Sequence, residues 1–314
     1  QARSAAEAAG SQASWAADNA ALNAGEAWVM LAQAEEFVSL LTKARDTVKA
    51  HVELAKSYVE QGMLVRSELL RAEVELARVE DLLEDAKGKA RVANANLAFR
   101  IGAAQDSTWQ LAPLPEPAPL DGDAATWVAS AASRKDLAAA RSLLRAGELE
   151  EKVKKAAWFP KVGVSARWDL HDKNLFGASG SAGTVMAFAA VNLFQGGADK
   201  AAVAAAREEA RAGREDVARF ADGVALEVRQ AYEEASTARA RHATAVRALE
   251  SARESERITD ERFKSGVVKT IDLLDAATAR REAETRELVA RADAHATALR
   301  LAVKAGKAPE TVAP

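Results

Sequence analysis

The chain of 314 residues contains no cysteine, which excludes disulfides and thiolate metal sites. This absence does not decide the redox compartment, because a cysteine-free chain suits either environment. Aromatic residues are also scarce, at 5% of the sequence. Glycine and proline gather in a few places, while alanine and charged residues dominate the remainder. This composition favours long helices.

A strong excess of one charge and a long apolar run are both missing. The formal net charge is -3 at pH 7, and the absence of a basic run that could bind phosphate backbones argues against nucleic acid as a partner. A membrane-spanning helix needs roughly 18 consecutive apolar residues, whereas the best run here is VMAFAAV at 185–191. A membrane crossing by this chain would therefore have to use strands.

An internal duplication organises what is present. Gly62 and Gly266 each separate two alanine-rich helical segments, and their numbers differ by 266 − 62 = 204. A repeat of this length predicts two copies of one supersecondary unit. The same offset pairs Ala27 with Ala231, Trp28 with Tyr232, Leu69 with Leu273, Leu97 with Leu301 and Gly102 with Gly306.

Each copy carries the apolar pattern of packed helices. A seven-residue repeat predicts a left-handed supercoil, and glycine tolerates the backbone angles of a tight reversal. We therefore expect two antiparallel helical hairpins, 1–106 with its tip near Gly62 and 198–306 with its tip near Gly266. Residues 198–264 alone would form a helix on the order of 100 Å long. The repeat includes Ala34, Leu41, Val48 and Ala55, then Leu69, Leu76, Leu83, Ala90 and Leu97.

A connector and a strand pair separate the two copies. The Pro-rich stretch APLPEPAPLDGD at 112–123 cannot continue a helix, and with one short and one longer helix it makes up the region 107–157. The apolar period then changes to two in WFPKVGVSARWDL and again in TVMAFAAVNLF, which predicts strands. We expect a β-hairpin over 158–197 with a polar loop at 171–183, and a C-terminal tail at 307–314.

One face of this hairpin is expected to contact lipid. Trp158 and Trp168 lie ten residues apart, which at about 3.3 Å per residue and a tilt of about 40° spans roughly 25 Å, the height of an outer-membrane apolar band. A half-buried hairpin in a soluble sheet is the alternative, although two strands alone are barely stable in water. The predicted lipid-facing residues are Trp158, Val162, Val164, Ala166, Trp168, Val185 and Val191.

The order of these features resembles the TolC-like outer-membrane efflux channel family. The resemblance covers nearly the whole chain and is carried by AAWFPKVGVSA, NLFQGG and RFKSGVVKTIDLLDA, together with the duplication. It implies a mainly α fold with a membrane β-hairpin. Long antiparallel coiled-coil helical hairpins would form a trimeric α-barrel, continuous with a trimeric 12-stranded outer-membrane β-barrel.

The resemblance also implies a function. The protein would be a passive exit duct of a tripartite efflux or type I secretion system, in the Gram-negative outer membrane and extending into the periplasm. Its implied partners are two further copies in a homotrimer, a periplasmic adaptor (membrane fusion protein), an inner-membrane pump of RND or ABC type, and outer-membrane lipid. No catalysis and no cofactor are expected. The alternative is a soluble periplasmic coiled-coil or adaptor protein that binds partner helices.

The chain departs from the family in the number of its strands. A family protomer supplies four strands, whereas this sequence contains one predicted pair. By the repeat offset, the partner of Trp158 would lie at 158 − 204 = −46, and the partner of the helix beginning near 124 would lie at 124 − 204 = −80. We therefore expect about 80 mature residues, with the first strand pair, to be absent from this sequence. The N-terminus lacks an initiator Met and signal-peptide regions, which agrees with a fragment or processed product.

Both hairpin tips acquire roles from the resemblance. Acidic side chains near the second tip constrict the family's aperture, and Asp272 and Asp275 match them; such a ring favours cations and responds to divalent ions. The family's Tyr and Arg in this constriction are replaced by Phe263 and Val268, with Lys269 adjacent. The dipole of a helix's first turn also explains both acids. The adaptor-docking residues would be Gly62, Met63, Leu64, Gly266, Val267 and Val268.

Metal and phosphate motifs are not predicted. The histidines show no ligand spacing such as HExxH, and each is interpreted as a solvent-facing or packing residue. The GASGSAG loop lacks the Lys and the strand-to-helix context of a phosphate cradle, so we interpret it as a flexible external loop. The four histidines are His51, His171, His242 and His295.

Overall fold

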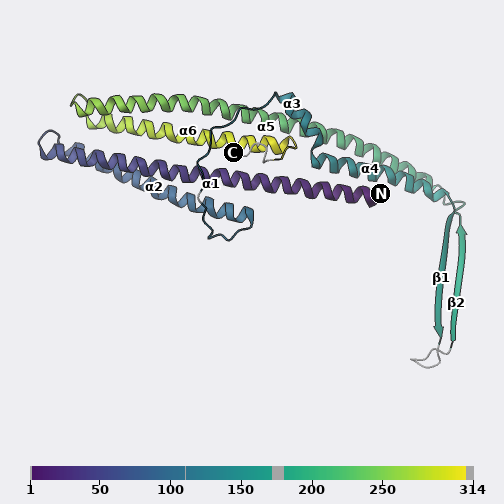
Figure 1. Cartoon of the computed structure of the whole chain (residues 1–314). Helices are drawn as coiled ribbons and strands as arrows, with labels where there is room; N and C mark the ends of the chain where they lie inside the picture. The colour runs from purple at the N-terminus through teal and green to yellow at the C-terminus, as the bar shows by residue number, and fades with distance from the viewer. Residues whose placement is uncertain (1, 110, 172–179, 309–314) are drawn as a thin grey trace. The chain divides into compact units, whose positions relative to one another are not determined.

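The computed structural model describes residues 2–109, 111–171 and 180–308. It is mainly helical with a two-stranded sheet, as predicted (Figure 1). The chain divides into two compact units, Gln1–Gln12 with Lys135–Asp222, and Ala13–Arg134 with Gly223–Pro314. The elements are α1 (Ala2–Glu60), α2 (Arg66–Ile101), α3 (Ala124–Ser130), η1 (Ala131–Ser133), α4 (Lys135–Lys155), η2 (Ala156–Trp158), β1 (Lys161–His171), β2 (Gly180–Ala190), α5 (Ala198–Lys264) and α6 (Thr270–Lys304).

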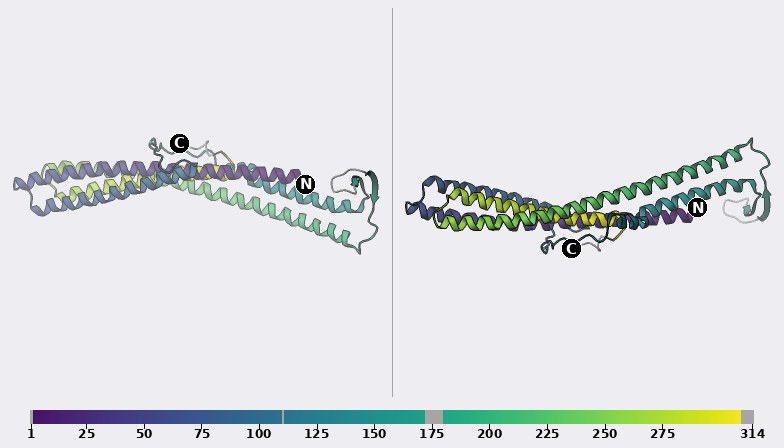
Figure 2. Two further views of the ribbon diagram at one scale, coloured as in Figure 1. Left: turned by 90° about the horizontal axis from the view of Figure 1, so that it is seen from below. Right: turned by 90° about the horizontal axis from the view of Figure 1, so that it is seen from above.

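Two helical hairpins make up most of the unit Ala13–Arg134 with Gly223–Pro314. α1 pairs with α2 and α5 pairs with α6, and within this unit the helices run side by side in both views of Figure 2. The residues of the seven-residue repeat face the interior, where Leu41 of α1 packs with Leu83 and Ala86 of α2. The apolar period therefore produces the packing that it predicts.

The duplication repeats in hydrogen bonds as well as in sequence. The Met63 N–H donates to Tyr58 O at 2.8 Å, and the Val267 N–H donates to Arg262 O at 2.9 Å. The C-terminal ends match in the same way, because Gly102 and Gly306 have φ of 71° and 76°. The same backbone motif thus ends both hairpins, 204 residues apart (306 − 102).

α2 of the first hairpin contacts α6 of the second. Leu274 packs with Val52 and Ala72 near the tips. Further along α6, Arg281 Nη1 donates to Glu75 Oε1 at 2.8 Å, with side chains only 9% and 15% exposed. An apolar cluster and a largely buried ion pair therefore join the two repeats.

The connector packs onto the hairpins through its leucines. Leu114, 1% exposed, lies in a cluster with Leu22, Val29 and Leu299. The connector ends where Asp123 caps α3, its side chain accepting a hydrogen bond from the Thr126 N–H at 2.9 Å. Proline prevents a helix here, so side chains from the neighbouring helices satisfy the connector's backbone.

The unit Gln1–Gln12 with Lys135–Asp222 contains α4, the strands and the beginning of α5. Glu148 of α4 accepts a hydrogen bond from Arg214 Nε of α5 at 2.9 Å. β1 and β2 are antiparallel, and Val164 pairs with Ala187. Among the described residues, each helix lacks the uninterrupted apolar stretch that a transmembrane span requires.

The strand boundaries differ from the prediction. Trp158 lies in η2 and not in a strand, because Pro160 has no N–H for a ladder and holds Phe159 in an extended conformation. Val191 follows the end of β2. At the other end the strands run further than expected, to His171 and from Gly180, because ladder bonds use backbone atoms and glycine can make them. Residues 172–179 of the expected loop and 309–314 of the expected tail lie outside the described residues.

Candidate functional site

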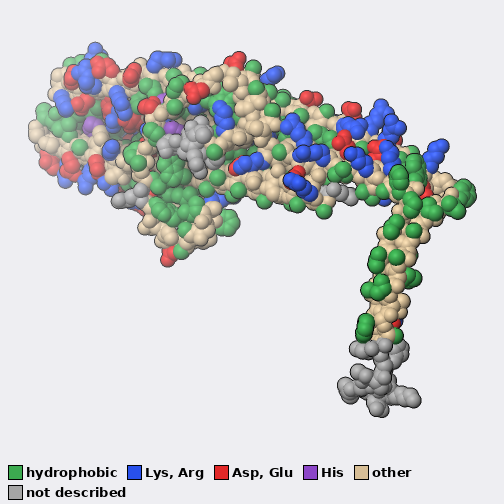
Figure 3. Space-filling view, turned by 45° about the vertical axis from the view of Figure 1, so that its right-hand side comes forward, with side chains coloured by type: hydrophobic (Ala, Val, Ile, Leu, Met, Phe, Trp, Pro, Cys, Tyr) green, Lys and Arg blue, Asp and Glu red, His purple; other side chains and the backbone are tan. Residues whose placement is uncertain are grey.

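The strand pair has one continuous apolar face. Side chains of directly opposed residues share a face, and Val162 pairs with Ala189, Val164 with Ala187, and Ala166 with Val185. The apolar faces predicted separately for the two strands therefore coincide. Val162, Val164, Trp168 and Val185 are each more than 70% exposed, and green side chains follow the strands in Figure 3. A contiguous exposed apolar surface of this kind marks an interaction site for a membrane or for another protein.

Two aromatic rings cover glycines across the ladder. A Cβ on Gly183 would lie 2.6 Å from the Trp168 ring, and a Cβ on Gly163 would lie 2.6 Å from the Phe188 ring. The first pair lies on the apolar face and the second on the opposite face, since side chains alternate along a strand. These glycines provide the space in which the rings lie flat against the sheet.

The predicted docking residues occupy the two hairpin turns. Gly62 and Gly266 have φ of 74° and 73°, a conformation that glycine adopts without strain. The following residues, Met63 and Val267, are 59% and 72% exposed. Leu64 and Val268 are half-buried in corresponding positions. The first tip therefore presents Met63 and Val65 to solvent, the latter 64% exposed, and the second tip presents Val267.

The two predicted gate acids have different environments. Asp272 Oδ2 accepts a hydrogen bond from the Lys269 backbone N–H at 3.0 Å, so Asp272 caps the first turn of α6. Asp275 is exposed and lines a groove that also contains Val74 of α2 and Ile271 of α6. Both acids are exposed, and the capping interpretation accounts for Asp272 alone.

The first hairpin carries a different charge pattern at the same place. By the repeat offset, Glu68 corresponds to Asp272 (272 − 204) and Arg71 corresponds to Asp275 (275 − 204). Glu68 Oε1 pairs with Arg71 Nη1 at 3.4 Å. One acid and one base at the first tip offset each other, whereas the second tip has two acids.

Phe263 packs inside the tip region. It is 5% exposed, and its ring centroid lies 6.1 Å from that of Tyr58 in a tilted arrangement. An aromatic pair at this distance is attractive. Phe263 therefore lies between the tips of the two repeats and away from solvent, where it would not line an aperture.

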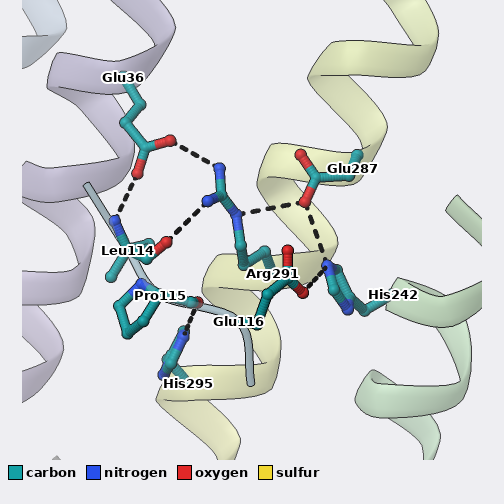
Figure 4. A network of polar contacts seen from close by, with 8 residues as sticks. All are labelled: Glu36, Leu114, Pro115, Glu116, His242, Glu287, Arg291 and His295. Carbon is teal, nitrogen blue, oxygen red and sulfur yellow. Dashed lines mark hydrogen bonds and ion pairs between the residues drawn. The ribbon is translucent and has the colours of Figure 1, made fainter. Parts of the chain in front are cut away.

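A polar network holds the connector to the helices (Figure 4). Arg291 of α6 donates to Leu114 O at 2.7 Å and to Glu36 Oε2 of α1 at 2.6 Å. Glu36 Oε1 in turn accepts from the Leu114 N–H at 2.7 Å. His295 donates from Nε2 to Pro115 O at 2.8 Å. Burial, with Arg239 and Arg291 nearby, lowers the pKa of His295, so this imidazole is neutral at pH 7.

Beside this network the fold brings together three metal-ligating groups that sequence spacing does not reveal. His242 Nε2 of α5 lies 3.1 Å from Glu287 Oε1 of α6 and 3.7 Å from Glu116 Oε2 of the connector. The ligand atoms of all three residues lie within 4.8 Å of one another. His242 is 7% exposed, so the packing interpretation accounts for its burial. The positions are distant in sequence, and only the fold of the connector onto α5 and α6 joins them.

Comparison with known families identifies the class of protein. The sequence profile described as outer membrane efflux protein matches residues 128–307, which is more than half of the chain. The chain belongs to this family of efflux channels. Membership places it in the outer membrane of a Gram-negative cell, with an extension into the periplasm.

Solved structures of outer-membrane channels have the same fold. OprN aligns over 98% of this chain and 70% of its own, with a TM-score of 0.79 and 20% identity. VceC from Vibrio cholerae aligns over 98% of this chain and 74% of its own, with a TM-score of 0.78 and 19% identity. The open MtrE channel of Neisseria gonorrhoeae aligns over 98% of this chain and 72% of its own, with a TM-score of 0.75 and 20% identity. No curated protein matches the sequence.

Proposed function

We propose that this chain is the main part of a passive exit duct in the outer membrane. Three copies would form the duct, in which the strand pairs contribute to the expected twelve-stranded barrel and the helical hairpins to a tunnel. A periplasmic adaptor and an inner-membrane pump of RND or ABC type would open and supply it, in a tripartite efflux or type I secretion system. Substrate choice and energy would come from the pump, and the chain itself would carry out no catalysis.

The observation that carries this proposal is the apolar face shared by β1 and β2. A free two-stranded sheet with several exposed valines is unfavourable in water. In a membrane the same face would contact lipid chains and leave water, while Ser165 and Arg167 on the opposite face would contact an aqueous lumen. The family match over residues 128–307 supports the same assignment independently.

The proposed aperture and docking surface use the two tips. Asp275 would face the lumen and contribute to a ring of three carboxylates, which attracts cations. Asp272 would hold the start of α6 in place through its bond to the Lys269 N–H. Met63 and Val267 would insert into apolar positions of the adaptor, with Leu64 and Val268 below them and Gly62 and Gly266 shaping the turns.

A charged substitution on the apolar face tests the membrane assignment. An arginine near the bilayer midplane costs about 2 to 4 kcal/mol, so Val164→Arg should sharply reduce the amount of assembled protein in the outer membrane. The matched control is Ser165→Arg, one residue along on the opposite face, where an arginine can point into water. The measurement is the yield of assembled protein in the outer-membrane fraction of cells that express the intact protein.

Two outcomes are distinguishable. A loss for Val164→Arg together with a near-normal yield for Ser165→Arg supports lipid contact by this face. Equal yields for both variants and the wild type would contradict it, and would favour a soluble helical protein whose strand pair stays outside the membrane.

A further inference from the structure

We propose that Glu116, His242 and Glu287 form a binding site for a divalent transition metal ion, best matched by Zn²⁺. The site would join the connector to α5 and α6, and it is separate from the tips and the strand pair. It lies within the unit Ala13–Arg134 with Gly223–Pro314.

The distances between the ligand atoms fit a tetrahedral ion. Bonds of about 2.0 to 2.2 Å to nitrogen and carboxylate oxygen place two ligands of a tetrahedral ion about 3.4 Å apart. His242 Nε2 lies 3.1 Å from Glu287 Oε1 and 3.7 Å from Glu116 Oε2, values on either side of this separation. The structure therefore needs only small side-chain movements to bind the ion.

The ligand set determines the kind of metal. One imidazole and two carboxylates suit borderline ions such as Zn²⁺, whereas Mg²⁺ and Ca²⁺ prefer ligands that are all oxygen. In the metal-free protein the His242 Nε2–H links to Glu287, and the ion would replace this hydrogen. Three protein ligands leave a fourth position for water.

The local charge favours a cation. In Figure 4 the carboxylates of Glu36, Glu116 and Glu287 lie around the Arg291 guanidinium, so acidic groups outnumber basic ones among the residues drawn there. Arg291 Nε approaches Glu287 Oε1 at 3.2 Å but makes no hydrogen bond within the described structure. The bound ion would share Glu287 with this ion pair, while Arg291 acts as a positioning residue through its hydrogen bonds to Glu36 and Leu114.

The two kinds of ligand differ in mobility. His242 and Glu287 are nearly buried, with side chains 9% and 13% exposed, and come from packed helices, whereas Glu116 is 79% exposed and belongs to the connector. The ion would therefore bind a preformed pair and draw the third ligand in from solvent. Its expected effect is to fasten the connector to the second hairpin.

Zinc binding to the intact protein tests the proposal. We expect one Zn²⁺ per chain by isothermal titration calorimetry, a rise in the midpoint of thermal unfolding with Zn²⁺, and no comparable effect of Mg²⁺. Glu116→Gln should weaken Zn²⁺ binding by at least about 10-fold and abolish the rise in midpoint. Glu116 is exposed, so this variant retains the fold. His242→Ala and Glu287→Gln should have the same effect.

The matched control is His51→Ala, which removes another histidine of the same unit and should leave Zn²⁺ binding unchanged. Co²⁺ offers a second readout, since a tetrahedral Co²⁺ site gives intense visible absorption that Glu116→Gln should remove. The proposal is overturned if the wild type shows no Zn²⁺-specific binding, or if Glu116→Gln and His242→Ala bind Zn²⁺ as tightly as the wild type.

Discussion

At the scale of single residues, similar charges have different roles because their surroundings differ. Asp272 and Asp275 are both exposed, and Asp272 accepts a hydrogen bond from the Lys269 N–H. Arg281 is nearly buried with Glu75, while Arg286 pairs with Glu282 on the surface at 3.0 Å, with side chains 69% and 55% exposed. Because a buried charge has lost its hydration, removing one residue of a buried ion pair destabilises the fold, whereas removing one residue of an exposed pair changes the free energy of unfolding very little.

Arg281→Ala should destabilise the helical hairpins. The substitution removes the 2.8 Å ion pair of the largely buried Glu75 and leaves that carboxylate only the longer pair with Arg78, at 3.8 Å. We expect this to cost about 1 to 3 kcal/mol. The control Arg286→Ala removes an exposed pair and should change the free energy of unfolding by less than about 0.5 kcal/mol. Chemical unfolding of the intact protein, followed by its helical signal, measures both. Equal decreases in the free energy of unfolding for the two variants would show that the buried α2–α6 ion pair stabilises the protein no more than an exposed pair does.

At the scale of elements, the repeat specifies both hairpins and their turns. α1 ends at Glu60 and α5 ends at Lys264, and α2 begins at Arg66 where α6 begins at Thr270, each pair differing by 204 (264 − 60 and 270 − 66). The turns between them depend on a positive φ at one glycine each. A side chain at that glycine would meet no neighbouring atom within 4 Å, so its cost would be backbone strain alone.

Gly266→Ala and Gly223→Ala should therefore have opposite effects. Gly266 has φ of 73°, where a side chain costs about 1 to 2 kcal/mol, so the first variant should be less stable than the wild type. Gly223 lies inside α5 with open space around it, and alanine is favoured there by about 1 kcal/mol. Thermal unfolding midpoints of both variants measure the contrast. A Gly266→Ala variant as stable as the wild type would contradict the conclusion that the turn needs a positive φ at this position.

The elements also show what a sequence can and cannot predict. Periodicity and the 204-residue offset (266 − 62) were enough for the helices and the apolar face of the strands, since these follow from local spacing. The strand ends were wrong at Trp158 and Val191, because pairing stops at Pro160 and after Ala190. The Glu116, His242 and Glu287 cluster was missed, because three elements distant in sequence meet there only after folding.

At the scale of the whole molecule, the proposed function uses the apolar face of the strand pair and the tips of the two helical hairpins, whose charges differ. The first tip pairs Glu68 with Arg71, and the second carries Asp272 and Asp275. In the proposed assembly of three copies, the acids of the second hairpin would contribute the negative charge of the aperture. The proposal therefore predicts a cation-selective entrance.

The most direct measurement is single-channel conductance of the intact protein in planar bilayers, beside the double variant Asp272→Ala, Asp275→Ala. We expect the wild type to conduct, to prefer cations and to be blocked by divalent ions, and the double variant to lose this block. A conducting wild type whose variant behaves identically would retain the duct and remove the acidic aperture. No conductance from an intact, folded trimer would contradict the central claim that this protein is an exit duct.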